Sequence, residues 1–256
     1  MDKTKHPFRI KWGQNFVIDS NLIEKIERLI SPKKDDSILE IGPGDGSLTK
    51  KIFPNVKEMV AVEIDPLLIK QLTVSPILKG LNLIQGDILH QDIEDLPLSR
   101  SPRVIGNIPY NITSPIIFWL IEQLDFWEDA YIMMQFEVAE RLLADPGSKD
   151  YSRITVMAGV YLDIDLCFKI SPEVFYPKPK VQSAIVRFTK KKYPVISDDL
   201  YVKFSKIVKK AFSMRRKMLK NSLKEYDIPD KVKNEIDFSR RPETLSLYEF
   251  AKLVDH

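Results

Sequence analysis

The stretch Gly106-Asn107-Ile108-Pro109-Tyr110 contains the residue types best suited to chemistry. It follows the apolar pair Val104-Ile105, which indicates the end of a buried strand. An amide side chain and the Ile108 carbonyl can accept two hydrogen bonds from one amino group, and Pro109 stiffens the backbone that holds that carbonyl. The Tyr110 ring can stack on a flat surface. This combination is suited to binding the amino edge and one face of a planar base.

Predicted strands and helices alternate along the first part of the chain and place this stretch at a strand end. Short apolar runs predict strands at 37–41, 59–64, 81–85, 103–105 and 131–134. Helical spacing predicts helices at 20–30 with Ser20 as N-cap, at 47–53, through 67–72, at 115–121 and at 137–143. This alternation is typical of an α/β fold with a parallel sheet and helices on both faces. A helix at 154–160 and extended segments at 162–170 and 183–188 then predict a closing antiparallel hairpin at the sheet edge.

The chain becomes basic and helical from Asp198 onward. Nine bases and no acid lie between residues 203 and 224, namely Lys203, Lys206, Lys209, Lys210, Arg215, Arg216, Lys217, Lys220 and Lys224. The net charge of the 256 residues is only +3, so these bases are concentrated rather than spread. Such a cluster indicates a polyanionic partner more than an ordinary solvated helix face. We therefore predict two domains, 1–192 and 193–256, of which the second is small, all-helical and binds nucleic acid.

Three glycines, at positions 42, 44 and 46, follow the strand at 37–41 and precede a helix. Glycine in this context lets the backbone turn tightly and approach a ligand closely. Glu63 ends the next strand, 19 positions after Gly44, where a carboxylate can accept two ribose hydroxyls. Asp87 ends the third strand at the corresponding height and can accept a hydrogen bond from an adenine amino group. Together these residues predict a nucleoside cofactor.

The spacing of the glycines indicates which cofactor this is. The pattern is G-x-G-x-G rather than the G-x-G-x-x-G of pyrophosphate cofactors, which disfavours a nicotinamide oxidoreductase. Glu40 precedes the loop, where an acid is unfavourable beside a pyrophosphate and favourable beside a cationic amino-acid tail. S-adenosylmethionine has such a tail, a sulfonium charge and no phosphate. We therefore predict methyl transfer to the N6 amine of an adenine that leaves its stack and binds at Asn107.

Composition disfavours several other classes of protein. No apolar run approaches the roughly 20 residues that span a bilayer, and the first residues contain no apolar signal segment. We therefore expect a cytoplasmic protein without membrane contact. The single cysteine, Cys167, excludes an internal disulfide and a multi-cysteine zinc site, and three scattered histidines disfavour another metal site. We expect no metal and a monomeric protein.

The chain resembles, over nearly its whole length, the ribosomal RNA adenine dimethylase family (the KsgA type, related to the Erm resistance methylases). The matching segments are 13–16, 40–46, 62–65, 86–87, 107–111, 137–141, 175–184, 215–217 and 221–223. The resemblance implies a Rossmann-like class I methyltransferase sheet and S-adenosylmethionine as methyl donor. It also implies a substrate, two adjacent adenosines near the 3′ end of small-subunit (16S) ribosomal RNA, and a role in ribosome biogenesis on that RNA or the assembling 30S subunit.

The same resemblance implies roles for individual residues. Residues expected to hold the cofactor are Gln14, Asn15, Val17, Gly42, Gly44, Glu63, Asp87, Ile88 and Asn107. Residues expected to hold the target base are Asn107, Ile108, Pro109, Tyr110 and Phe175, with Tyr110 and Phe175 stacked on its two faces. Residues expected to bind RNA phosphates are Arg215, Arg216, Lys217 and Lys220. Phe136 departs from the family pattern because it stands where a lysine is common, which puts one basic contact to RNA in doubt.

Two alternatives remain open from the sequence. An Erm-type enzyme would perform the same chemistry on an adenine of large-subunit (23S) ribosomal RNA. A non-catalytic RNA-binding factor for ribosome assembly could have the same fold, although Asn107 and the complete set of predicted cofactor residues favour an enzyme.

Overall fold

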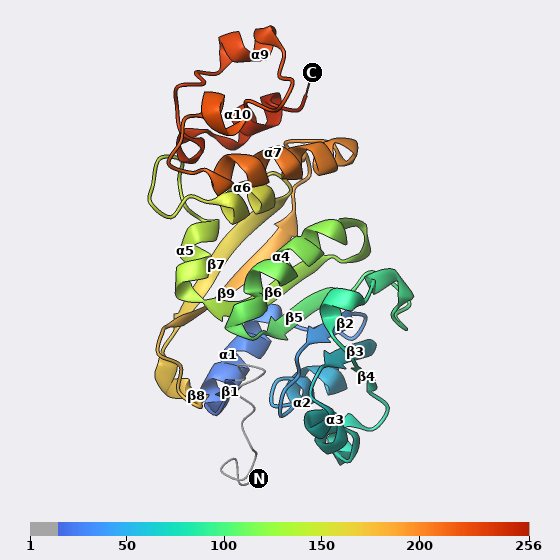
Figure 1. The fold of residues 1–256 in the computed structure, drawn as a ribbon. Helices are drawn as coiled ribbons and strands as arrows, with labels where there is room; N and C mark the ends of the chain where they lie inside the picture. Colours follow the sequence, from blue (N-terminus) through green and yellow to red (C-terminus); the bar gives the residue numbers. More distant parts are fainter. Residues whose placement is uncertain (1–14, 256) are drawn as a thin grey trace. The chain divides into compact units, whose positions relative to one another are not determined.

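The computed structural model describes residues 15–255, which contain a seven-stranded sheet (Figure 1). The strand order is β4-β3-β2-β5-β6-β9-β7. The chain begins the sheet at β2, adds β3 and β4 on one side, and then crosses to β5 on the other side of β2. The neighbouring strands from β4 to β6 are all paired in parallel. A topological switch point therefore lies between the carboxyl ends of β2 and β5, where open α/β sheets bind their ligands.

The five parallel strands lie within two residues of the predicted starts: β2 Ser37–Ile41, β3 Glu58–Glu63, β4 Asn82–Gln85, β5 Arg103–Asn107 and β6 Asp129–Gln135. Every residue of β2 is buried, as expected for a strand covered on both faces. Strand β5 continues two residues beyond the prediction, through Gly106 into Asn107. Gly106 permits this because a Cβ there would lie only 3.0 Å from the Ile41 carbonyl oxygen of β2.

The helices of the first part of the chain agree in place with the prediction: α1 Ser20–Ile30, α2 Thr49–Ile52, α3 Pro66–Thr73, α4 Thr113–Glu122, α5 Phe136–Leu142 and α6 Arg153–Gly159. Short 3-10 turns lie at 53–55, 76–78, 88–90, 93–95, 110–112, 124–126, 172–174, 198–200 and 242–244. The prediction of Ser20 as N-cap of α1 is wrong. Asp19 caps the helix, because its carboxylate accepts a hydrogen bond from the Leu22 amide at 2.9 Å.

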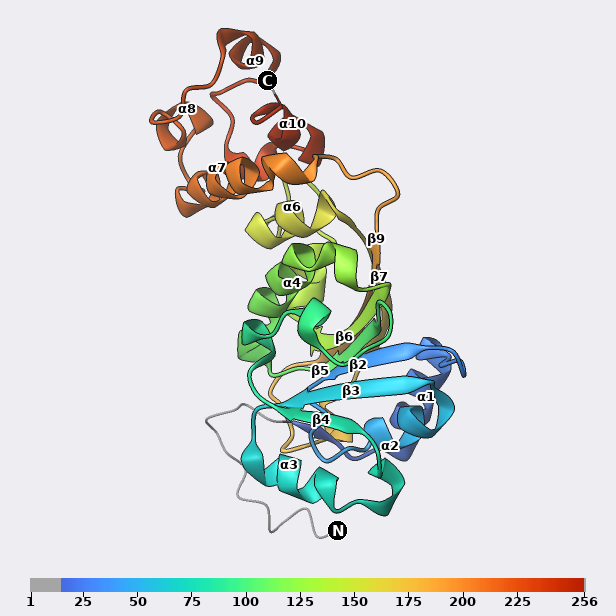
Figure 2. The ribbon, with the colours of Figure 1, turned by 90° about the vertical axis from the view of Figure 1, so that its right-hand side faces the viewer.

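Antiparallel strands close the sheet, as predicted (Figure 2). Strand β9 Ser183–Lys190 pairs antiparallel with β6, and β7 Leu162–Ile170 lies beyond β9 at the edge. A second, two-stranded sheet was not predicted. It pairs β1 Phe16–Val17 with β8 Phe175–Tyr176, two segments that are far apart in the sequence.

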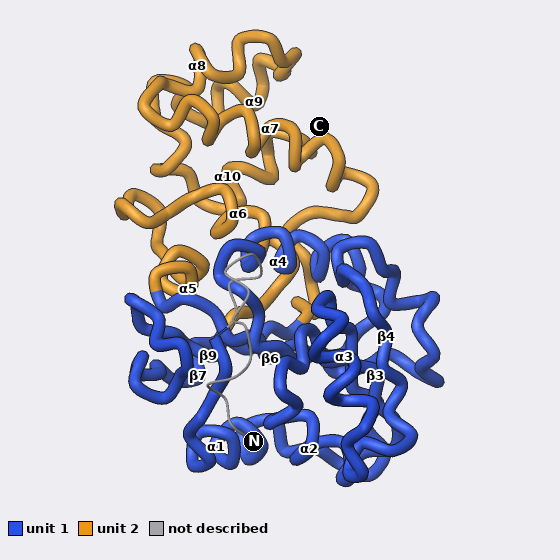
Figure 3. Tube along the Cα trace, turned by 60° about the horizontal axis from the view of Figure 1, so that its bottom comes forward, with its two compact units in different colours: residues 1–136, 165–189 blue, residues 137–164, 190–256 orange. Residues whose placement is uncertain are grey.

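The chain divides into two compact units, coloured blue and orange in Figure 3. Unit 1 comprises residues 1–136 and 165–189, and unit 2 comprises 137–164 and 190–256. The chain passes from unit 1 to unit 2 between residues 189 and 190, close to the predicted domain boundary between residues 192 and 193. Residues 137–164 were predicted in the first domain but group with the C-terminal helices. These helices are α7 Tyr201–Ser213, α8 Leu219–Ser222, α9 Asp230–Glu235 and α10 Leu247–Lys252. Phe204 and Phe250 are fully buried in unit 2, so this unit has its own apolar core.

Among residues 15–255, none of the helices is both long enough and apolar enough to cross a bilayer.

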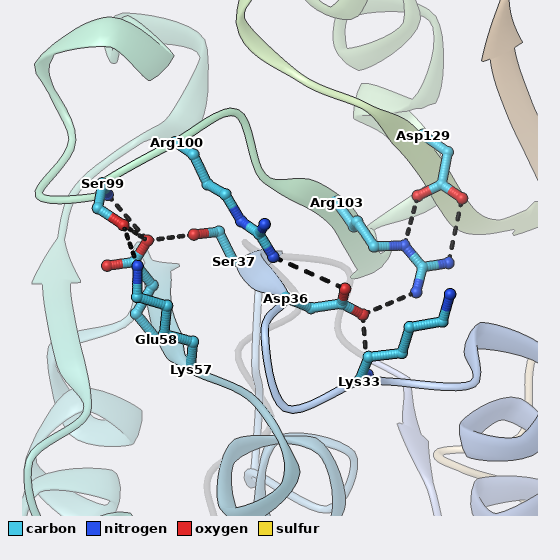
Figure 4. Close-up of polar contacts among 9 residues, drawn as sticks. All are labelled: Lys33, Asp36, Ser37, Lys57, Glu58, Ser99, Arg100, Arg103 and Asp129. Atoms are coloured by element: carbon cyan, nitrogen blue, oxygen red, sulfur yellow. Dashed lines mark hydrogen bonds and ion pairs between the residues drawn. The ribbon is translucent and has the colours of Figure 1, made fainter.

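Charged side chains gather at the amino ends of the parallel strands, at the opposite edge of the sheet from Asn107 (Figure 4). Arg103 opens β5, and its Nε and Nη2 donate to the Asp129 carboxylate at 2.8 and 3.1 Å. Its Nη1 donates to Asp36, the residue before β2, at 3.0 Å. Burial by itself would lower the pKa of Arg103, but the hydrogen bonds to Asp129 and Asp36 raise it above its ordinary value. The guanidinium therefore ties three adjacent strands together at their starts.

A second group in Figure 4 joins β3 to the loop that leads into β5. The carboxylate of Glu58, the first residue of β3, accepts hydrogen bonds from the Ser99 amide at 2.8 Å and the Ser99 hydroxyl at 2.7 Å. It also accepts one from the Ser37 hydroxyl at the start of β2. Burial by itself would raise the pKa of Glu58, but these hydrogen bonds together lower it below its ordinary value.

Replacement of Arg103 by methionine should lower the free energy of unfolding by about 3 kcal/mol, because two carboxylates would lose their hydrogen-bonded cation in a site where the side chains are only 11–12% exposed. Arg100 and Arg187 would remain only at 4.0 Å from Asp36 and 3.8 Å from Asp129. Urea unfolding measures the change in free energy. Lys51→Met is the matched control, because its ion pair with Glu24 is 47–48% exposed and should contribute less than about 1 kcal/mol. Equal effects of the two substitutions would contradict a structural role for Arg103.

Candidate functional site

A cavity of about 240 Å³ opens at the carboxyl ends of the parallel strands and lies wholly within unit 1. Its walls include Glu40 and Ile41 of β2, Glu63 of β3 and Asn107 of β5. Because parallel strands end at the same edge, these side chains, distant in sequence, share one pocket. The pocket thus lies at the switch point between β2 and β5, where the fold predicts a ligand.

The glycine loop forms one wall of the pocket. Gly42, Gly44 and Gly46 all have positive φ, between 60° and 75°, a conformation that other residues rarely adopt. At Gly44 a Cβ would also lie 3.3 Å from the Phe16 ring, so the N-terminal strand β1 packs directly on the loop. The absence of a side chain therefore serves both the turn and the close contact with Phe16.

The Glu63 carboxylate is hydrogen-bonded to the backbone of this loop. One of its oxygens accepts a hydrogen bond from the Gly44 amide at 3.1 Å, and the other accepts one from the Asp65 amide at 2.9 Å. Glu63 is 3% exposed, and burial raises its pKa although these two hydrogen bonds oppose the shift. Each oxygen still has a lone pair for a ligand hydroxyl.

Glu40 is the second acid of the pocket. It is 2% exposed, and its Oε2 atom is buried without a hydrogen-bond partner in the described part of the chain. Burial raises its pKa to about 7, and the negative charges of Glu63 and Asp45 add to this effect, which the Thr49 side chain opposes. A buried carboxyl with an unsatisfied oxygen in a pocket wall fits a ligand that donates hydrogen bonds or carries a positive charge.

Asn107 is oriented by the chain itself. Its Nδ2 donates a hydrogen bond to the backbone carbonyl of Asn15, at 3.0 Å. The amide nitrogen is thereby engaged, and the side-chain oxygen remains as the acceptor. Both residues line the pocket. The arrangement can therefore accept a hydrogen bond from an amino group of a bound molecule.

The residues after Asn107 are fixed by burial and by one hydroxyl pair. Ile108 is 2% exposed, and Pro109 lines the pocket. The Tyr110 hydroxyl lies 2.6 Å from the hydroxyl of Ser183, a fully buried residue at the start of β9. Burial raises the pKa of Tyr110, against the effect of the Ser183 hydrogen bond, so the phenol remains neutral. Sequence reasoning did not find Ser183, because its only signal is its place at the start of a strand.

Phe175 lies elsewhere than the sequence predicts. It is 2% exposed and belongs to an apolar cluster with Val17 and Ile26. Its strand, β8, pairs with β1 so that Phe175 lies opposite Val17. Neither Phe175 nor Tyr110, the other residue predicted to stack on the base, is among the residues that line the cavity. The stacking role predicted for Phe175 is therefore a prediction that would require the ring to leave this cluster.

The structure brings the other predicted cofactor residues together. All of those that it describes line the cavity: Asn15, Val17, Gly42, Gly44, Glu63, Asp87, Ile88 and Asn107. Gln14 lies outside the described residues. Phe16, Asn111 and Met133 also line the cavity and were not predicted to bind the cofactor. Asn111 stands in the motif itself, whereas Met133 is separated from it in sequence and gave no signal.

The predicted phosphate-binding residues of unit 2 fall into two classes. Arg215 is engaged within the unit, since its Nη2 donates to the Lys149 carbonyl at 2.6 Å and its Nε lies 3.8 Å from Glu243. Arg216, Lys217 and Lys220 are exposed, and none has an ion-pair partner among residues 15–255. Arg215 thus has partners within the protein, and its predicted contact with RNA remains a prediction.

Within residues 15–255, no cluster of three or more His, Cys, Asp or Glu side chains is arranged to hold a metal ion.

Comparison with known proteins gives the family context of this site. Residues 5–251 match the family described as ribosomal RNA adenine dimethylase. The protein called ribosomal RNA small subunit methyltransferase A of Nitrosospira multiformis is 38% identical, over 98% of this chain and 97% of its own length. The protein of the same name from Hahella chejuensis is 40% identical, over 98% of this chain and 93% of its own length.

Two solved structures share the fold over almost the whole chain. A dimethyladenosine transferase from Plasmodium falciparum superposes with a TM-score of 0.78 at 26% identity, covering 93% of this chain and 95% of its own. The 23S rRNA methyltransferase ErmE superposes with a TM-score of 0.68 at 25% identity, covering 94% and 98%. Both neighbours thus contain the mostly parallel sheet with its antiparallel edge, which confirms the predicted fold class.

Proposed function

This chain belongs to the ribosomal RNA adenine dimethylase family, and from that membership we propose how its residues act. The protein is an S-adenosylmethionine-dependent methyltransferase that modifies adenine in small-subunit ribosomal RNA. The observation that best supports the residue assignment is the orientation of Asn107 in the pocket, with its nitrogen bonded to the Asn15 carbonyl and its oxygen left to accept a hydrogen bond.

We further propose the finer points that the sequence predicts. The target is a pair of adjacent adenosines near the 3′ end of the small-subunit RNA, presented by the assembling 30S subunit. The protein acts as a monomer in the cytoplasm, where that subunit is assembled. The names of the curated relatives, each of which refers to the small subunit, support the choice of the small-subunit RNA.

The residues of the pocket fit S-adenosylmethionine. The buried Oε2 of Glu40, which has no hydrogen-bond partner in the described part of the chain, would pair with the cationic amine of the methionine tail. Gly42 and Gly44 let the backbone approach the ligand, and the remaining lone pairs of Glu63 would accept the ribose hydroxyls. At the rim, one oxygen of Asp87 is fixed by the Leu89 amide at 3.0 Å, and the carboxylate would accept from the adenine amine.

Asn107 and Ile108 would act on the amine that is methylated. When bound, S-adenosylmethionine supplies a strongly electrophilic methyl group. The N6 lone pair of adenine is delocalised into the ring and is a weak nucleophile. The Asn107 oxygen and the Ile108 carbonyl would accept the two N6 hydrogens, which localises the lone pair toward the methyl donor. Their partial negative charges would also stabilise the positive charge that develops on N6.

Tyr110 would stack on the adenine that has left its helix, since the Ser183 hydroxyl holds the phenol in place. Positioning two reactants in this way can contribute several kcal/mol, within a ceiling of about 7–11 kcal/mol. Because the Ile108 side chain is 2% exposed, packing beneath the motif restricts movement of its backbone. Orientation and electrostatics from these groups would favour direct transfer without a covalent intermediate on the protein, and the methylated N6 would then release a proton to water.

The two alternative functions have less support. The structural similarity to ErmE is compatible with an Erm-type activity on large-subunit RNA, but the curated relatives at 38–40% identity are named for the small subunit. A non-catalytic assembly factor would have no need for a cavity that contains Glu40, Glu63 and Asp87 in its wall and reaches Asn107 at the switch point.

Transfer of tritiated methyl groups to purified unmethylated small subunits tests this function. We expect N6,N6-dimethyladenosine in the small-subunit RNA, mapped to two adjacent adenosines, and no label in large subunits offered in parallel. Label confined to large subunits would support the Erm-type alternative. Absence of label in both, with RNA binding intact, would support the non-catalytic one.

Cofactor binding should depend on pH through Glu40, whose pKa is raised to about 7 by burial. Below this pH the carboxyl is protonated, so pairing with the cationic amine releases a proton. Affinity measured by calorimetry should therefore fall as pH is lowered, by up to about tenfold per unit below about pH 6.5. Glu40→Gln should bind more weakly at about pH 7.5 and show a flatter profile. An unchanged slope in this variant would assign the proton to another group, such as Glu63.

A further inference from the structure

Two neighbouring residues near the end of β7 each form a cation–π contact. The Lys169 ammonium lies 3.9 Å from the centre of the Phe136 ring, and the Lys25 ammonium lies 3.8 Å from the centre of the Phe168 ring. Successive side chains of a strand point to opposite faces of the sheet. The two contacts therefore lie on opposite faces, which makes them a natural pair for comparison.

The Lys169 contact lies at the same edge of the sheet as the pocket. Phe136 directly follows β6, and its amide donates to the Gln182 carbonyl at 2.9 Å. The next residue, Ser183, pairs with Gln135 in the sheet and holds the Tyr110 hydroxyl at 2.6 Å. A continuous series of short contacts thus connects the Lys169 ammonium to the tyrosine of the base-binding motif. All these residues belong to unit 1.

The positive charge of Lys169 is held in place but not neutralised. The side chain is exposed, and no carboxylate of residues 15–255 lies within 4.0 Å of its ammonium. In the loop that follows β7, the acid Glu173 is paired with Lys178 at 2.7 Å. Lys180 in the same loop is also exposed and has no acidic partner in the described part of the chain. Lys169, connected to Ser183 through Phe136 and Gln182, and Lys180, two residues before Gln182 in the sequence, are therefore two positive charges near the Tyr110–Ser183 hydrogen bond with no acidic partner among residues 15–255.

A cation held on an aromatic face is suited to an anion of fixed position. The aromatic ring restricts the flexible lysine side chain before any ligand arrives. When a nucleotide leaves its stack to enter a pocket, its own backbone phosphates come to the mouth of that pocket. Contacts to these phosphates position the nucleic acid without reading its sequence.

We propose that Lys169, seated on Phe136 and assisted by Lys180, binds the RNA phosphodiester backbone next to the target adenosine. This inference depends on the proposed function, because it requires an RNA nucleotide at the pocket. It assigns unit 1 a phosphate-binding site of its own, separate from the basic residues of unit 2.

The salt dependence of RNA binding tests the proposal. The full-length protein is titrated with unmethylated small ribosomal subunits at several monovalent salt concentrations and constant Mg²⁺. Each phosphate contact contributes close to one unit to the slope of log affinity against log salt concentration. Between about 50 and 200 mM salt, the affinity of Lys169→Gln should therefore fall by a factor about threefold smaller than that of the wild-type protein. Lys169→Arg keeps the charge and should keep the slope of the wild type. Lys25→Gln is the matched control, because it removes the same charge from the same kind of contact on the opposite face.

Three outcomes separate this inference from the proposed function. A reduced slope for Lys169→Gln alone supports it. A wild-type slope for Lys169→Gln, or an equal reduction in Lys25→Gln, overturns it, since the charge would then act only in general attraction. Methyl transfer by the wild-type protein to small-subunit adenines is measured in parallel. This measurement tests the proposed function independently of the phosphate site. A protein that methylates normally but shows no change in slope with Lys169→Gln would refute only the phosphate site.

Discussion

The hydrogen bond from Asn107 Nδ2 to the Asn15 carbonyl determines which atom of the amide can meet a bound amine. The bond requires two things of the fold. Strand β5 must reach Asn107, which Gly106 permits by its close approach to β2. Strand β1 must lie over the glycine loop, where Phe16 packs on Gly44 and pairing with β8 holds the strand. A site for a weak nucleophile thus depends on backbone register more than on any reactive side chain.

Charged residues have different roles at the amino ends and at the carboxyl ends of the parallel strands. At the amino ends, Arg103 joins Asp36 and Asp129 in a compact charged group whose members satisfy one another. At the carboxyl ends, the pKa of Glu40 is raised, and one of its oxygens has no hydrogen-bond partner among residues 15–255. Leaving such a group unsatisfied costs stability in the free protein, and this cost is recovered when a cation binds. The contrast explains why acids at one edge stabilise the fold and acids at the other are available to a ligand.

The sequence predicted those parts of the structure that depend on local patterns. Apolar runs located the parallel strands. Glu63 and Asp87 were expected to lie in one site because each follows or ends a parallel strand, and parallel strands have their carboxyl ends on the same side of the sheet. Contacts between distant segments gave no such pattern. The pairing of β1 with β8 rests on two residues from each, and it buries Phe175 instead of presenting it to the pocket. Likewise nothing in the sequence predicted that Phe136, which stands where a lysine is common in the family, lies beneath the ammonium of Lys169. Nor did it predict that Arg215 is engaged by backbone carbonyls and Glu243.

The role of Asn107 is tested most directly by the single-turnover rate of methyl transfer in Asn107→Ala, at saturating cofactor and unmethylated small subunits. We expect a rate lower by about 100-fold or more, because one acceptor directed at the developing charge is removed. The affinity for RNA should change by less than about threefold, since the basic surfaces supply most of it. A single-turnover rate close to that of the wild-type protein would contradict the account.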